Sequence, residues 1–207
     1  MRIGVLALQG DFIEHITILE KLGAEVIAIR RSNQLEGVDG LILPGGESTT
    51  IITLMHGYGL FQSVKELAQS GLPVIGTCAG MILLAKKVTN ADMDTLAVMD
   101  IEVRRNAFGR QVDSFETELD IPMLGEKRFS AVFIRAPFIE HTASSVEVIC
   151  RLPDDTIVAA RQGNLLALSF HPELSGDNLL HRYFLKTVMS YVSGCKNESR
   201  NITTQAC

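Results

Sequence analysis

Residues 73–87 read PVIGTCAGMILLAKK, and this stretch decides the class of fold. Residues 73–76 form a short apolar run, which is typical of a buried strand, and the apolar residues from 79 to about 87 predict a helix. Cys78 lies in the turn between the two. A strand, a tight turn and a helix make up the repeating unit of α/β proteins with a parallel sheet.

The same alternation of elements extends towards the N-terminus. Asp11 can cap a following helix, whose apolar residues recur at helical spacing and which should end at Gly23, where a left-handed residue is favoured. Strands that are apolar on both faces and are separated by helices indicate a parallel sheet covered on both sides. Such strands are expected at residues 3–8, 25–29 and 40–43, and a further helix at about residues 60–69.

The second half of the chain has a different pattern. Residues 96–119 alternate between apolar and polar types, which predicts antiparallel strands with one solvated face. We expect one domain over residues 1–193 and a polar, flexible tail over residues 194–207. Further strands are expected at residues 130–134, 147–152, 157–161 and 165–170, and a closing amphipathic helix at residues 178–192.

Composition excludes several classes of function. A chain of 207 residues that is 46% hydrophobic can bury one sizeable core. A net charge of −5 without a basic run argues against a nucleic-acid partner. The apolar run at residues 3–8 is too short for a signal peptide or a membrane span, so a cytoplasmic protein is expected. The four cysteines form no CxxC pair, which argues against a zinc knuckle, and we expect no metal.

Gly76-Thr77-Cys78-Ala79-Gly80 has the form of a nucleophile elbow with cysteine in the place of serine. Glycines two residues on either side of Cys78 would let the strand and the helix approach without a clash of Cβ atoms. The N-terminus of the helix would favour a thiolate. The alternative is a buried cysteine in an ordinary glycine-rich turn.

A second motif, His171-Pro172-Glu173, follows directly on the strand expected at residues 165–170. A histidine and a glutamate two residues apart can place the imidazole against the sulfur and let the carboxylate fix its tautomer. Together with the elbow, this motif favours a Cys78–His171–Glu173 triad over a structural histidine. The other histidines have no partner pattern and are expected at the surface or on helix faces: His15, His56, His141 and His181.

The third motif, Leu43-Pro44-Gly45-Gly46-Glu47-Ser48-Thr49-Thr50, follows another expected strand. No lysine follows its glycines, so a nucleotide-binding Walker loop is excluded. A Gly-Gly backbone can point an amide at a developing oxyanion, and the amide of Ala79 would be its partner. The alternative is a plain loop with a helix cap at Ser48 or Thr49, and the two interpretations are compatible.

On these motifs the chain resembles the class I (triad-type) glutamine amidotransferases, and within them the PdxT/SNO family. The resemblance leaves out only the tail after about Gly194. The Pro-Gly-Gly-Glu-Ser loop and an Arg-Asn-x-Phe-Gly-Arg-Gln segment are specific to this family. Besides the three motifs above, the resemblance rests on residues 3–10 (IGVLALQG), 104–111 (RRNAFGRQ) and 133–137 (FIRAP).

The resemblance implies a three-layer, flavodoxin-like α/β fold and an enzyme that hydrolyses L-glutamine to L-glutamate and ammonia. The ammonia would pass to a separate PdxS/SNZ-type subunit of pyridoxal 5′-phosphate synthase, and no cofactor is implied. By resemblance, Cys78 is the nucleophile, His171 the base and then acid, and Glu173 the residue that orients His171. The implied oxyanion-hole amides are those of Gly46 and Ala79, and the implied glutamine-binding residues are Gly46, Glu47, Ser48, Arg105, Ile134 and Arg135.

Two rival functions remain open. One is a glutaminase of the same fold that serves a different acceptor, although the two family-specific segments count against it. The other is a binding or regulatory module that keeps the elbow only as a scaffold. In that case Cys78 would not react with alkylating glutamine analogues.

Overall fold

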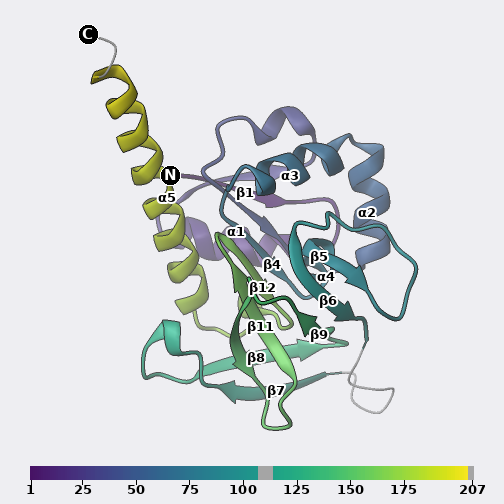
Figure 1. Ribbon diagram of the computed structural model, residues 1–207. Helices are drawn as coiled ribbons and strands as arrows, with labels where there is room; N and C mark the ends of the chain where they lie inside the picture. The colour runs from purple at the N-terminus through teal and green to yellow at the C-terminus, as the bar shows by residue number, and fades with distance from the viewer. Residues whose placement is uncertain (107–113, 205–207) are drawn as a thin grey trace.

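A ten-stranded sheet lies at the centre of the computed structural model, which describes residues 1–106 and 114–204 (Figure 1). Five neighbouring strands in it are parallel and follow the order β2-β1-β3-β4-β12. This is the strand order of flavodoxin-like sheets. The expected flavodoxin-like fold is thereby confirmed. The five strands are β1 (Arg2–Leu6), β2 (Glu25–Ile29), β3 (Gly40–Leu43), β4 (Val74–Thr77) and β12 (Leu165–Leu168).

Beyond β12 the sheet becomes mixed. Strand β11 pairs antiparallel with β12, β9 and β10, and β6 pairs antiparallel with β9 and parallel with β5. A separate two-stranded antiparallel sheet is formed by β7 and β8. The predicted antiparallel strands are therefore present. Of the strands in this part of the chain, β6 (Met99–Arg104), β7 (Ser114–Leu119), β8 (Phe129–Ile134), β10 (Glu147–Arg151) and β11 (Ile157–Gln162) were predicted, whereas β5 (Ala85–Val88) and β9 (Phe138–Thr142) were not.

Successive residues of the parallel strands face two different hydrophobic cores. In β3, for example, Leu41 and Leu43 belong to one cluster and Ile42 to the other. Side chains alternate between the two faces of a strand, so a strand that is apolar throughout must be covered on both sides. The continuous apolar runs in the sequence thus correspond to a doubly covered sheet.

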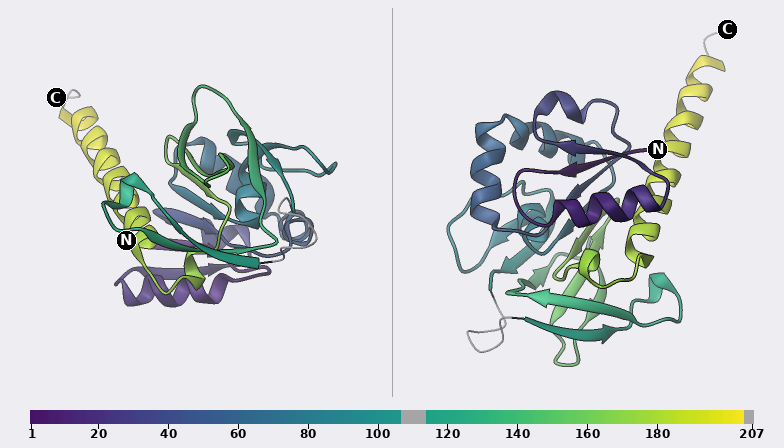
Figure 2. Two further views of the ribbon diagram at one scale, coloured as in Figure 1. Left: turned by 90° about the horizontal axis from the view of Figure 1, so that it is seen from below. Right: turned by 180° about the vertical axis from the view of Figure 1, so that it is seen from behind.

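Helices cover the two faces (Figure 2). On one face α2, α3 and α4 pack against the first cluster, and on the other α1, α5 and the β7–β8 sheet pack against the second. The helices are α1 (Phe12–Lys21), α2 (Ser48–Gly57), α3 (Leu60–Gln69), α4 (Ala79–Leu84) and α5 (Leu179–Thr204), with 3-10 turns η1 (Ser32–Leu35), η2 (Pro122–Leu124) and η3 (Pro172–Leu174). None of the helices in the described ranges combines the length and apolarity that a membrane span needs.

Four element predictions were wrong or incomplete. Strand β9 was not predicted. The helix expected up to residue 87 ends at Leu84 and continues as the edge strand β5, because a short apolar run fits either element. Helix α2 was foreseen only as a possible helix cap at Ser48 or Thr49, without bounds, since its β-branched residues favour strands. Helix α5 continues to Thr204, past the expected end at residue 192 and into the expected tail. The domain boundary at residue 193 stays a prediction.

Candidate active site

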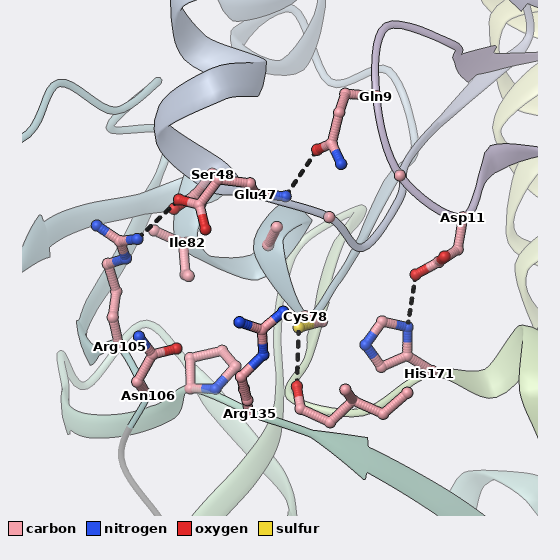
Figure 3. A pocket seen from close by; sticks show the side chains of 15 residues that line it. Gln9, Asp11, Glu47, Ser48, Cys78, Ile82, Arg105, Asn106, Arg135 and His171 are labelled. Carbon is pink, nitrogen blue, oxygen red and sulfur yellow. Dashed lines mark hydrogen bonds and ion pairs between the residues drawn. The ribbon is translucent and has the colours of Figure 1, made fainter. Parts of the chain in front are cut away.

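The sequence motifs meet at one edge of the parallel sheet. Strands β1, β3, β4 and β12 end beside one another, and the segments that follow them line a cavity of about 320 Å³ (Figure 3). Ligand sites of open α/β sheets lie at the carboxyl ends of the strands. The cavity is lined by Gln9, Gly10, Asp11, Gly46, Glu47, Ser48, Cys78, Ala79, Ile82, Arg105, Asn106, Ile134, Arg135, Pro137 and His171.

Cys78 occupies a strained turn between β4 and α4. Its φ is 48°, which non-glycine residues seldom adopt, and its backbone N–H donates to the carbonyl of Leu168 at 2.8 Å. The residue is 7% exposed, and its Sγ atom lies 3.9 Å from the carbonyl oxygen of Ile134. The geometry is that of a nucleophile elbow, as the sequence predicted.

The glycines that flank Cys78 permit this turn. A Cβ on Gly76 would collide with the carbonyl of Gly80, and a Cβ on Gly80 would collide with the carbonyl of Leu43. Both obstacles are backbone atoms, which cannot move aside as a flexible side chain can. The close approach of β3, β4 and α4 therefore requires glycine at both positions.

Replacing Gly80 with alanine should destabilise the fold by about 1–3 kcal/mol, the usual cost of overpacking a core. Gly57→Ala is the matched control, since no atom lies within 4 Å of the Cβ position at the end of α2. Urea unfolding followed by circular dichroism measures both variants. Equal midpoints for Gly80→Ala and the wild type would contradict the close approach.

His171 and Glu173 form a buried pair beside Cys78. The Nδ1 atom of His171 lies 2.7 Å from Oε1 of Glu173, and both side chains are almost fully buried. Burial alone would lower the pKa of His171, but its interactions with Cys78 and Glu173 raise that pKa to about 10. Burial would raise the pKa of Glu173, but His15 and His171 lower it to about 2. The pair therefore favours an imidazolium held by a carboxylate.

Asp11 approaches the same histidine from the loop after β1. Its Oδ2 lies 3.4 Å from Nδ1 of His171 (Figure 3), and its side chain makes no cap bond to α1, contrary to the expected capping role. Burial raises the pKa of Asp11. Among the described residues, Asp11, His171 and Glu173 are the one group close enough to share a metal ion. Because His171 Nδ1 already bonds to Glu173, these side chains form a hydrogen-bonded set, and the absence of a metal stays a prediction.

Two histidines expected at the surface or on helix faces lie in the interior. His15 and His181 are 0% and 2% exposed, and His15 Nε2 lies 3.1 Å from Oε2 of Glu173. Both lie on helix faces, on α1 and α5, as expected, but their burial and their contact with each other were not predicted, because a contact between residues 15 and 181 leaves no local pattern in the sequence. His56 and His141 are exposed, as predicted.

Charged side chains converge on the opposite side of the cavity. Oε1 of Glu47 lies 2.9 Å from a terminal nitrogen of Arg105, although residues 47 and 105 belong to distant segments. Burial would raise the pKa of Glu47, but hydrogen bonds from Thr49 and the nearby Arg105 and Arg135 lower it. Glu47 is also the N-cap of α2, whereas the sequence analysis expected the cap at Ser48 or Thr49.

Unsatisfied polar atoms also face this region. Ser48 is 2% exposed, and its Oγ has no hydrogen-bond partner among the described residues, nor has Nε of Arg105. Buried polar groups are normally paired, so such atoms indicate a place for a ligand group or water. Arg135 lines the cavity with a φ of 42°, a further strained residue.

The two residues expected to supply oxyanion-hole amides line the same cavity as Cys78. Gly46 has a φ of 150°, and a Cβ there would meet the side chain of Gln9. Oε1 of Gln9 accepts a hydrogen bond of 2.7 Å from the backbone N–H of Glu47, which fixes the loop against the segment after β1. Ala79 follows Cys78 at the start of α4. All the predicted site residues except Glu173 line the one cavity, and Glu173 lies behind His171.

The described part of the chain includes only the first two residues of the Arg-Asn-x-Phe-Gly-Arg-Gln segment. Arg105 and Asn106 line the cavity, and residues 107–113 lie outside the described part of the chain. Six lining residues were not predicted as site residues: Gln9, Gly10, Asp11, Ile82, Asn106 and Pro137. The position of Gln9 and Asp11 after a predicted parallel strand could have indicated them, since such strands end at the ligand edge.

The sequence is similar over nearly its whole length to proteins of known name. Pyridoxal 5′-phosphate synthase subunit PdxT of Dehalococcoides mccartyi strain 195 is 57% identical over 92% of this chain and 99% of its own length. The protein of the same name from Moorella thermoacetica is 57% identical over 91% of this chain and 100% of its own.

Solved structures agree in fold. A structure described as a glutamine amidotransferase superimposes with a TM-score of 0.84 at 48% identity, covering 90% of this chain and 98% of that one. A structure of PurLQS from Thermotoga maritima has a TM-score of 0.64 at 17% identity, covering 92% and 98% of the two chains, and shows the fold alone. The SNO glutamine amidotransferase family matches residues 5–190. With the elbow, the His-Glu pair and the flavodoxin-like sheet, the match shows that this chain belongs to the SNO glutamine amidotransferase family.

Proposed function

We propose that the chain is the glutaminase subunit of a pyridoxal 5′-phosphate synthase, which hydrolyses L-glutamine and delivers ammonia to a PdxS/SNZ-type synthase subunit. The observation that carries the proposal is a strained cysteine beside a buried histidine–glutamate pair, in a chain 57% identical to proteins named as PdxT subunits. The family-specific loop and Arg105 lie together on the same cavity, which favours this acceptor over another.

In the first half-reaction Cys78 attacks the side-chain amide carbon of glutamine. His171 has its Nδ1 fixed by Glu173, so its other ring nitrogen is free to exchange a proton with the sulfur and then with the leaving group. The carbon–sulfur bond forms, the carbon–nitrogen bond breaks, and the imidazolium protonates the nitrogen that leaves as ammonia. The products of this step are ammonia and a glutamyl thioester on Cys78.

In the second half-reaction water hydrolyses the thioester. His171 removes a proton from the water as it attacks, and the sulfur leaves as a thiolate that the imidazolium stabilises. Both tetrahedral intermediates carry an oxyanion beside Cys78. The backbone amides of Gly46 and Ala79 are proposed to stabilise it, since both residues line the cavity that Cys78 lines.

The charged side of the cavity, formed by Glu47, Arg105 and Arg135, suits the α-carboxylate and α-ammonium groups of glutamine. Arg105 and Arg135 are proposed to bind the α-carboxylate, and Glu47, whose lowered pKa keeps it ionised, the α-ammonium group. Ser48 offers an unpartnered hydroxyl, and Ile134 contributes its backbone beside the sulfur. A glutamine molecule bound there by its α-groups would extend its side-chain amide towards Cys78.

The proposed setting is the cytoplasm, where the thiols of Cys78 and Cys150 stay reduced. No nucleic acid, membrane, metal or cofactor enters the reaction as proposed. The expected partner is a protein, because free ammonia is lost to solvent unless an acceptor site receives it.

Ammonia release from glutamine, measured with and without a PdxS-type subunit, tests this function. The isolated chain should turn over slowly, and the synthase subunit should raise its rate by about tenfold or more, as expected of coupled sites. A synthase subunit heated until it unfolds serves as the control. If the purified chain is fully active and indifferent to the partner, the proposed partnership is wrong. If no ammonia is released under either condition, the glutaminase assignment fails.

A further inference from the structure

Two buried histidines, His15 and His181, lie behind the proposed triad. His15, on α1, places its Nε2 atom 3.1 Å from Oε2 of Glu173 and its Nδ1 atom 2.9 Å from Nε2 of His181, on α5. The rings of His15 and His181 are tilted by 51° with centroids 5.1 Å apart. Cys78, His171, Glu173, His15 and His181 therefore form one continuous polar chain that runs from the cavity into the second hydrophobic core.

The positions of the hydrogens in this chain follow from its geometry. Both oxygens of an ionised Glu173 are acceptors, and they face His171 on one side and His15 on the other. His15 must therefore carry a hydrogen on Nε2, whether its ring is neutral or charged. In the neutral ring Nδ1 is an acceptor, and it receives the hydrogen of His181 Nε2.

Glu173 needs such a second contact. The terminal torsion of a glutamate is soft, so one hydrogen bond to His171 does not fix the plane of the carboxylate. In addition, Asp11 lies 3.4 Å from the same Nδ1 atom and offers His171 a competing acceptor. Nε2 of His15, 3.1 Å from Oε2 of Glu173, is the group placed to hold the carboxylate and so to keep His171 turned towards Cys78.

We propose that His15 is a positioning residue for glutamine hydrolysis, which holds Glu173 through its second oxygen, and that His181 in turn orients His15. This inference rests on the proposed role of Glu173 in the triad. Burial supports it: His15 and His181 sit among apolar residues on the α1–α5 side of the sheet, where an unpaired polar ring costs stability. Burial, reinforced by His15, also lowers the pKa of His181 to about 3, so that ring is neutral when the enzyme works.

Replacing His15 with glutamine or with asparagine distinguishes a positioning role of its ring from a packing role. The Nε2 atom of glutamine lies about where the imidazole Nε2 lies, so His15→Gln can still donate to Glu173. The amide of His15→Asn is shorter and matches Nδ1, so it can meet His181 but not Glu173. We therefore expect His15→Asn to lower kcat about 10- to 100-fold, and His15→Gln to retain most of the wild-type kcat.

Both variants are assayed in the complex with the synthase subunit, with His56→Gln as the matched control. His56 is exposed and pairs with Asp94, so its replacement should leave the rate unchanged. KM for glutamine should stay within about twofold in all variants, because His15 lies behind the triad and does not line the cavity. The rate at which iodoacetamide alkylates Cys78 should fall with kcat.

Equal activity of the Asn and Gln variants, whether high or low, would overturn the inference, and so would a raised KM without a loss of kcat. A long-range ¹H–¹⁵N spectrum of the histidine rings in the wild-type chain gives a reading that depends on no variant's folding. It should show a hydrogen on Nε2 of His15, and a bare Nε2 there would also overturn the inference. A wild-type complex that releases no ammonia would instead refute the glutaminase function itself.

Discussion

Replacing Cys78 with serine should lower ammonia release from glutamine by about 10⁴-fold or more while the fold stays intact. The reason is that the reaction needs an ionised nucleophile. His171 sits beside the sulfur with a raised pKa and can hold a thiolate, whereas a serine hydroxyl gives up its proton far less readily. Serine is close to cysteine in shape and can adopt the same turn, so the strained backbone should persist. The measurement is the initial rate of ammonia release in the complex with the synthase subunit.

Cys150 provides the matched control. It is also buried, but burial and nearby Asp120 raise its pKa to about 11, which keeps it a neutral thiol. Cys150→Ser should therefore retain wild-type turnover, and an alkylating glutamine analogue should label Cys78 alone of the two. Substantial turnover in Cys78→Ser would remove Cys78 from the mechanism. Loss of activity in both variants would indicate damage to the fold.

The proposed triad could be found from sequence because each of its parts leaves a local trace. The elbow needs glycines at positions 76 and 80 for steric reasons, and those reasons act over a few residues. His171 and Glu173 are neighbours in the chain as well as in space. The expectation of a parallel sheet then placed both motifs at strand ends, which in such a sheet share one edge.

The parts that sequence reasoning missed depend on distant contacts. His15 and His181 meet across 166 positions, and each alone looks like an ordinary helix residue. Asp11 fitted a helix cap, but the approach of β12 turned its carboxylate towards His171 instead. Helix α2 contradicts the strand preference of its threonines and isoleucines, because Ile51 and Met55 gain burial in the first core.

Glu173→Gln should be nearly as damaging as the loss of the nucleophile, with a fall in kcat of about 10³- to 10⁴-fold. The amide has almost the shape of the carboxylate, but it cannot accept hydrogen bonds at both ends. If its oxygen faces His171, its NH₂ group faces the hydrogen on His15 Nε2. If it turns round, its NH₂ group faces Nδ1 of His171, and the imidazole must move its hydrogen to the nitrogen beside Cys78.

The pH dependence of the same variant distinguishes loss of charge from loss of shape. Glu173 helps to raise the pKa of His171, so its neutralisation should lower that pKa from about 10. The imidazolium that protonates the departing ammonia would then be lost at a lower pH, and the alkaline limb of the kcat profile should move in the same direction. Glu118→Gln, on the exposed side of β7, is the matched control and should leave the profile unchanged. A Glu173→Gln variant whose residual activity kept the wild-type alkaline limb would show that the carboxylate does not set the protonation of His171, and Glu173 would then have only a structural role.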